Sequence, residues 1–212
     1  DRLDYSTDTT AAVAKGPLAT ASYDLAATGN SSHGYWVGGG GETSHIQRID
    51  YGNDTATAVA KGPLSRSTDR FGGGSAADNG LSTHFVGNAS ISVGTDYGYL
   101  AGGDNPSASP NQVSTIQRID FATDTATATA RGPIPSNREK CVSMGNSDYA
   151  WIQLGDGASL VSRLNYANDT AVASLRGNTV STQPRRFGLQ SPTAGYIGGG
   201  HPGISTIDRI DF

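Results

Sequence analysis

The chain has 212 residues, of which 16% are charged, and its formal net charge is −4. Fewer residues are charged than the usual quarter, and no basic cluster offers the surface that nucleic acids or anionic membranes require. We therefore expect no nucleic-acid partner and, because no apolar run approaches the roughly 20 residues of a spanning helix, no membrane insertion.

One phrase recurs along the whole chain. Its copies read RLDYSTDTTAAVAKGPL, RIDYGNDTATAVAKGPL, RIDFATDTATATARGPI and RLNYANDTAVASLRGN, and they begin at Arg2, Arg48, Arg118 and Arg163. A shortened fifth copy, RIDF, begins at Arg209. Each of the first four arginines is followed by an aspartate six residues later, namely Asp8, Asp54, Asp124 and Asp169. Units of about 45 residues, with an extra stretch in the second, indicate a repeat architecture.

Each unit is predicted to contain four short strands. In the first unit, YDLAATGNSSHGYWVGGGG supplies two strands and IQRIDY a third, whose alternation places Arg48 and Asp50 on one face. YGNDT is a turn, because Asn and Asp bond their own backbone, and TATAVAKG is a fourth strand that ends at Pro63.

The later units follow the same order of elements. The second has an insertion loop at about 71–95, beginning FGGGSAADNGLSTH, and its first two strands are expected within FVGNASISVGTDYGYLAGG. The third has KCVSMGNSDYAWIQLGDG, the fourth has RRFGLQSPTAGYIGGG, and a closing strand covers 204–212. The pattern predicts an all-β fold, a single β-propeller domain over 1–212 with four-stranded antiparallel blades.

The blade count depends on how the ends of the chain meet. Four blades result if the N-terminal TTAAVAKG forms the fourth strand of the last blade, so that the termini close the ring. Arg2–Tyr5 and Arg209–Phe212 would then compete for one position. The alternative is that the chain is part of a longer propeller or of an assembly.

The units resemble kelch repeats. YWVGGGG, HIQRIDY, TATAVAKGPL and RSTDR follow the kelch order of a glycine pair, a Tyr-Asp-like element, a fourth strand, and then Pro and Arg. The fourth strand lacks the usual Trp, which makes the resemblance that of a divergent type. The wording of the repeat is also similar to repeats in proteins of marine phages and uncultured marine microbes.

The charged residues of the repeat are interpreted as architecture, because a single site would not recur in every unit. These residues are Arg48, Asp50, Asp54, Arg118, Asp120, Asp124, Arg163, Asp169, Arg209 and Asp211. Aromatic residues near the glycine clusters are candidates for a ligand or partner surface, although packing between blades competes with that reading. They are Tyr35, Trp36, Tyr97, Tyr99, Tyr149, Trp151 and Tyr196.

No catalytic, cofactor-binding or metal-ligating residues are predicted. The four histidines are scattered, Cys141 stands alone, and no nucleophile elbow or phosphate loop is present. Loops at about 71–85 and 104–112 are the candidate recognition loops. We therefore expect a non-enzymatic scaffold for recognition or assembly, in a virion, tail fibre or extracellular appendage, whose partners are other subunits and a host glycan or receptor. A propeller glycosidase and an intracellular kelch-type adaptor are the alternatives.

Overall fold

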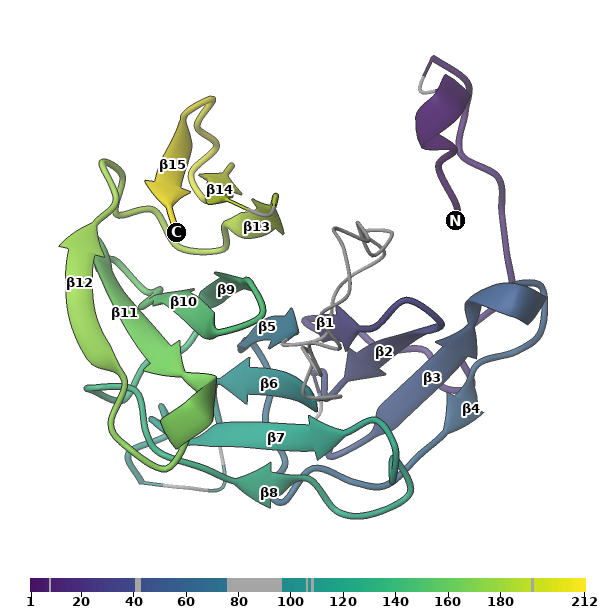
Figure 1. Cartoon of the computed structure of the whole chain (residues 1–212), viewed down its shortest axis with the longest axis horizontal. Helices are drawn as coiled ribbons and strands as arrows, with labels where there is room; N and C mark the ends of the chain where they lie inside the picture. The colour runs from purple at the N-terminus through teal and green to yellow at the C-terminus, as the bar shows by residue number, and fades with distance from the viewer. Residues whose placement is uncertain (8, 41–42, 76–96, 106, 108, 192) are drawn as a thin grey trace, which may run out of the picture.

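The computed structural model describes residues 1–7, 9–40, 43–75, 97–105, 107, 109–191 and 193–212. Its strands form four antiparallel sheets, arranged as the blades of a four-bladed propeller (Figure 1). Blade 1 contains β1 (Ala26–Gly29), β2 (His33–Val37), β3 (Ile46–Asp50) and β4 (Val59–Ala60), and blade 2 contains β5 (Gly72–Ser75), β6 (Tyr97–Ala101), β7 (Ile116–Asp120) and β8 (Thr129–Ala130). Blade 3 contains β9 (Val142–Gly145), β10 (Tyr149–Gln153), β11 (Leu160–Asn165) and β12 (Ser174–Asn178), and blade 4 contains β13 (Phe187–Gln190), β14 (Ala194–Gly198) and β15 (Ile207–Asp211).

The second and third strands keep the same register in every blade. An aromatic residue of the second strand is always paired with the arginine that begins the repeated phrase. The pairs are Tyr35 with Arg48, Tyr99 with Arg118, Trp151 with Arg163 and Tyr196 with Arg209. Because paired residues of antiparallel strands lie on the same face, each blade presents an aromatic ring beside a guanidinium group.

The predicted turn after the third strand is confirmed. It is a short 3-10 helix at η2 (Tyr51–Asn53) and η3 (Tyr166–Asn168), and a similar helix, η1 (Tyr5–Thr7), lies in the N-terminal segment. Asp50 and Asn165 cap η2 and η3 by accepting hydrogen bonds from backbone amides two residues on. These side chains therefore serve the turn, as short polar side chains commonly do.

The glycine pair that ends the second strand has a conformational cause. Gly38 and Gly39 have φ angles of +64° and +124°, a region that residues with a Cβ rarely occupy. The same pair recurs after β6 and β14. In blade 3, Asp156 and Gly157 take positive φ values instead. The cluster therefore makes the sharp exit from each second strand, which explains its recurrence.

The hydrophobic core lies between the blades. One cluster joins blades 1 and 2 and includes Tyr35, Ile46 and Phe121. A second joins blades 2 and 3, and a third, with Met144 and Ile197, joins blades 3 and 4. Each sheet is thus covered by its neighbours, as the flat faces of propeller blades require.

The four blades surround a common axis. The innermost strands β1, β5, β9 and β13 follow one another around the middle of Figure 1, and residues of all four line a central cavity of about 530 Å³. Blade 4 has three strands, and β15 pairs only with β14 among the described strands. The expected closing strand from TTAAVAKG does not join it: Val13 pairs with Arg2, and Arg2, Lys15 and Gly16 contact Asp54 of blade 1.

The first strand of blade 2 lies earlier than predicted. β5 is formed by Gly72–Ser75, inside the stretch interpreted as an insertion loop. A Cβ at Gly73 would lie 2.2 Å from the carbonyl oxygen of Ala27 in blade 1, so the strand can lie this close to blade 1 only with glycine at this position. A close approach between inner strands thus selects glycine, which composition alone presents as a loop signal. The remainder of the predicted loop, 76–95, lies outside the described residues.

Candidate functional site

One carboxylate and three donor groups, which together we call the clamp, join blade 1 to blade 2. Asp124, in the turn of blade 2, accepts a hydrogen bond from the Tyr35 hydroxyl at 3.0 Å and from the Arg48 guanidinium at 2.7 Å. Lys61 forms an ion pair with the other carboxylate oxygen at 3.2 Å. The ring of Tyr35 stacks on Phe121, with centroids 4.8 Å apart. All three donors come from blade 1, so one carboxylate holds the two blades together.

The same clamp joins blade 2 to blade 3. Asp169 accepts from the Tyr99 hydroxyl at 3.0 Å and from Arg118 at 2.8 Å, and it pairs with Arg131 at 3.3 Å. Tyr99 stacks on Tyr166 with a centroid distance of 4.7 Å. The recurrence of the phrase in the sequence is thus the recurrence of this junction.

Backbone contacts complete each clamp. At the first junction, the amide of Gly62 donates to the carbonyl of Asp124 at 2.8 Å, and Ala128 donates to the carbonyl of Pro63 at 2.8 Å. A Cβ on Gly62 would lie 2.1 Å from the carbonyl oxygen of Ala126. The phrase therefore needs glycine at this position because the next blade's turn lies directly against it.

The protonation states suit a structural role. Burial and the hydrogen bond to Asp124 raise the pKa of Tyr35, so its hydroxyl stays a donor. Burial alone would raise the pKa of Asp124, but hydrogen bonds from Tyr35 and Lys61 and the charge of Arg48 hold it below the ordinary value. Near neutral pH, a neutral phenol beside an ionised carboxylate stabilises a contact and does not exchange protons.

An unfilled version of the clamp lies at the outer side of blade 1. Asp54 pairs with Arg2 at 2.8 Å and with Lys15 at 3.2 Å, and Gly16 donates to the Asp54 carbonyl at 2.8 Å. Tyr51 occupies the position of Phe121, but no described tyrosine stacks on it. A cavity of about 280 Å³ lies there instead, lined by Arg2, Lys15, Pro17, Leu18, Trp36, Ile49, Tyr51 and Asp54 among others. We call it the blade-1 socket.

The junction of blades 3 and 4 is also incomplete. Trp151 replaces the tyrosine and stacks on Phe212, with centroids 4.1 Å apart. Arg163 lies over the Tyr149 ring at 4.1 Å, and neither it nor Arg176 forms an ion pair within the described part of the chain. A Cβ on Gly177 would meet no atom within 4 Å. Blade 3 thus carries the basic half of a clamp without its carboxylate.

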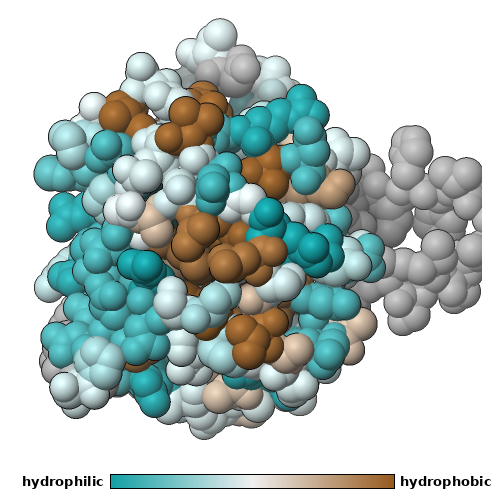
Figure 2. Space-filling model, turned by 90° about the vertical axis from the view of Figure 1, so that its left-hand side faces the viewer, coloured by the Kyte–Doolittle hydropathy of each residue, from teal (hydrophilic) through white to brown (hydrophobic). Residues whose placement is uncertain are grey.

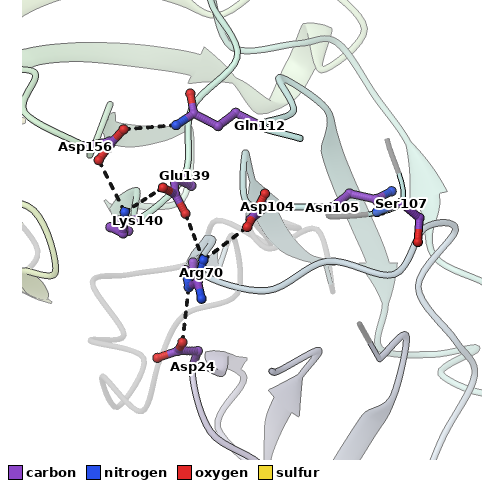
Figure 3. A network of polar contacts seen from close by, with 9 residues as sticks. All are labelled: Asp24, Arg70, Asp104, Asn105, Ser107, Gln112, Glu139, Lys140 and Asp156. Carbon is purple, nitrogen blue, oxygen red and sulfur yellow. Dashed lines mark hydrogen bonds and ion pairs between the residues drawn. The ribbon is translucent and has the colours of Figure 1, made fainter. Parts of the chain in front are cut away.

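A separate polar network lies where the chain enters the inner strands (Figure 3). Arg70 bonds the carboxylates of Asp24, Asp104 and Glu139 at 3.2, 3.1 and 3.3 Å, so it joins blades 1, 2 and 3. Lys140 bridges Glu139 and Asp156, and Gln112 also donates to Asp156 at 3.0 Å. Asp104 and Gln112 are the ends of the predicted recognition loop at 104–112.

Four residues around this entrance share an unusual backbone conformation. Asp24, Arg70, Lys140 and Arg185 have φ angles of +53°, +51°, +56° and +59°, and each stands two residues before an inner strand. All four line a pocket of about 180 Å³, which we call the axial pocket. Non-glycine residues in this region are uncommon and are enriched at functional positions. Their types differ from blade to blade, so no sequence pattern indicated them.

The aromatic residues predicted as a surface divide into two groups. Tyr35, Tyr99 and Trp151 are 1%, 3% and 5% exposed, so they pack between blades, which is the alternative that the sequence analysis set beside a surface role. The other four are half-buried, namely Trp36, Tyr97, Tyr149 and Tyr196. Trp36 lines the blade-1 socket, and Tyr97 lies under the Arg118 guanidinium at 4.0 Å.

Several charged residues of the repeat have partners within the fold. Arg48 and Arg118 pair with turn aspartates of the next blade, and Asp50 and Asp120 cap their own turns instead. Only Arg209 and Asp211 pair within one strand among the described residues, at 2.7 Å. Asp8 lies outside the described residues. Sequence analysis also missed the basic residue that stands thirteen positions after each anchor arginine, at Lys15, Lys61, Arg131 and Arg176.

Within the described residues, no group of three or more histidine, cysteine, aspartate or glutamate residues is arranged to hold a metal ion. None of the helices in that part of the chain has the length and apolar character needed to span a bilayer. No protein-family model matches the sequence, and a search of curated proteins finds no match. The fold is a four-bladed β-propeller, and its functional assignment depends on the residues described above.

Proposed function

We propose that this chain is a non-catalytic propeller scaffold for recognition or assembly. The observation that supports it is the clamp: at two junctions, the ionisable residues of the repeat are bound to one another between blades. Asp124 is ionised and Tyr35 is neutral, so neither is poised to act as an acid or a base near neutral pH. The propeller supplies a rigid body on which loops and open edges are held in place.

The specific setting that we propose is a phage virion, a tail fibre or another extracellular appendage. The sequence observations behind this setting are the low charge, the abundant glycine and the wording of the repeated phrase, which resembles repeats in marine phage proteins. The partners would be other subunits of the assembly and a glycan or receptor on the host surface. Mass spectrometry of the native complex that contains the chain tests the setting. A large regular assembly supports it, and a free single subunit contradicts it.

The axial pocket is the place that we propose for glycan recognition. Arg185 is exposed at its rim, and residues of all four blades line it. Guanidinium groups bind carboxylate and hydroxyl oxygens, which acidic glycans present. The rigid inner strands would hold these groups in fixed positions, which lowers the entropy lost on binding.

A glycan array with the intact chain and two variants tests this recognition role. Arg185→Asn removes the guanidinium, and asparagine tolerates the left-handed backbone at this position. Arg176→Asn makes the same change on the outermost strand of blade 3 and serves as the control. Binding that is lost only in Arg185→Asn supports the proposal. Release of reducing sugar from a bound glycan would support the glycosidase alternative, and binding unaffected by Arg185→Asn would exclude this pocket.

A further inference from the structure

We infer that a second copy of this chain docks head to tail on the blade-1 socket, where Tyr196 of the second copy inserts between Tyr51 and Asp54. The inference rests on the proposed assembly function and names its partner. Blade 4 of the second copy would then contact blade 1 in the way that blade 1 contacts blade 2. Such a heterologous contact forms closed rings or filaments, depending on the rotation between copies.

The socket matches the two filled junctions residue by residue. Asp54 corresponds to Asp124 and already has its basic partners, Arg2 and Lys15. Tyr51 corresponds to Phe121, on which Tyr35 stacks. The missing component is a phenol that stacks on Tyr51 and donates to Asp54. The cavity of about 280 Å³ lies beside both of these residues.

Blade 4 carries the missing component at the other end of the molecule. Tyr196 is paired with Arg209 in the same register that pairs Tyr35 with Arg48. The Arg209 side chain is 59% exposed and pairs only with Asp211 of its own strand among the described residues. Tyr196 and Arg209 are therefore the two donors of a clamp whose acceptor is the carboxylate in the socket.

Hydrophobic exposure indicates the same face of blade 4. Ile207 begins β15 and is 69% exposed, whereas its counterparts Ile46 and Ile116 are 1% and 0% exposed. Ile46 is buried in the cluster that contains Leu64 and Phe71. Leu18, which lines the socket, and Leu25 hold the corresponding positions in the chain, and both are half-buried. Docking would cover Ile207 with these two leucines.

Exposed hydrophobic side chains also lie on the side of the molecule formed by blades 3 and 4. Figure 2 views that side and shows hydrophobic side chains scattered between polar ones. The exposed large hydrophobic residues of the two blades include Val172, Leu175, Val180, Phe187, Leu189 and Ile207. Among them, Ile207 differs from its buried counterparts Ile46 and Ile116, so this residue marks the proposed docking face.

The edge of β15 would be completed by the same contact. In blades 1 to 3, the repeat arginine of the third strand pairs with a fourth-strand residue, as Arg48 does with Val59. In the N-terminal segment Val13 holds this fourth-strand position and pairs with Arg2 through an isolated bridge. The Arg2 side chain is 61% exposed. Arg209 of the second copy can therefore replace Arg2, and Val13 then extends blade 4 of that copy.

The structure favours a second copy over closure within one chain. Phe212 stacks on Trp151, and Ile197 is buried with Val142 and Met144, so blade 4 is fixed to blade 3. In this arrangement Tyr196 does not line the blade-1 socket of its own chain. A second copy can bring its blade 4 to the socket without disturbing these contacts.

Sedimentation of the full chain over a concentration series tests the inference. We expect a mass above the 21.8 kDa of one copy that grows with concentration. Ile207→Lys and Tyr196→Ala should each weaken association at least about tenfold, as expected for central interface residues. Ile207 is exposed in the single copy, so its substitution should leave the unfolding midpoint unchanged. The controls are Val180→Lys, at an 89% exposed residue, and Tyr97→Ala in blade 2.

Cysteine cross-linking distinguishes docking of a second copy on the socket from closure within one chain. Mixed Leu18→Cys and Ile207→Cys chains should form a disulfide-linked pair, while buried Cys141 stays unreactive. A single-copy mass at every concentration, equal dissociation by the control variants, or an intrachain link in the double variant would overturn the inference. None of these results decides the scaffold function, which the glycan array and the native complex test separately.

Discussion

Removal of the Asp124 carboxylate should be among the most damaging single changes at a blade junction. In Asp124→Ala, Arg48 and Lys61 lose the anion that they share, and the Tyr35 hydroxyl loses its acceptor. Truncating one partner of a buried ion pair costs about 3–5 kcal/mol. Arg48 retains 27% of its side-chain exposure and can be partly solvated by water, so we expect a loss of about 2–4 kcal/mol.

Equilibrium unfolding in urea measures this loss as a shift of the midpoint at unchanged slope. Asp50→Ala is the matched control, because that carboxylate is exposed and caps its own turn through the amide of Gly52. It should cost about 1 kcal/mol, the typical value for a lost cap. Equal losses in the two variants would refute the idea that the carboxylate between blades stabilises the junction.

The contribution of the Asp124 carboxylate should also depend on acid. Hydrogen bonds from Tyr35 and Lys61 and the charge of Arg48 outweigh burial and hold the pKa of Asp124 below its ordinary value of 3.8. A carboxyl with a lowered pKa contributes its full stability above the ordinary value and loses it as the pH falls through the lowered one. The stability difference between the intact chain and Asp124→Asn should therefore narrow between about pH 5 and pH 2. A constant difference would contradict this linkage.

Three further substitutions or reactions test neighbouring parts of the fold. Gly62→Ala should cost about 1–3 kcal/mol in urea unfolding, because its Cβ would lie 2.1 Å from a carbonyl oxygen, whereas Gly177→Ala meets no atom within 4 Å and should be neutral or stabilising by up to about 1 kcal/mol. If both changes are tolerated equally, the close approach between blades is wrong. Arg186→Ala leaves Asp208 without the guanidinium that contacts it at 2.6 Å, and the loss should reach about 3–5 kcal/mol in thermal unfolding. A loss below about 1 kcal/mol would count against a buried pair there. Burial raises the pKa of Cys141 to about 12, so a thiol reagent should modify it only as the chain unfolds, and immediate labelling of the native protein would disprove its burial.

Several features of the fold could be predicted because their causes are local. Alternation in IQRIDY, turn chemistry in YGNDT and the positive φ angles of Gly38 and Gly39 all depend on residues adjacent in the chain. Their repetition at a spacing of about 45 residues was enough to indicate blades and a propeller. The architectural role of the Arg and Asp residues was predicted on the same basis.

The partners within the site could not be predicted in this way. Arg48 has Asp50 two residues away on its own strand and Asp54 six residues away, yet it binds Asp124, which is 76 residues distant. Only the packing of blade 2 against blade 1 places that carboxylate within reach. The glycines of β5 present the same problem, since the approach of β1 to β5 decides that they form a strand.

The sequence by itself determined the repeated unit: its strands, its turns and the positions that recur. The tertiary structure alone decided which recurring residues meet, because each clamp takes its acid from one blade and its bases from the blade before. It also decided that blades 1 and 4 keep opposite halves of an unfilled clamp. The repeat shows which clamp residues each unit carries. Whether those residues find partners depends on how the units are arranged in space.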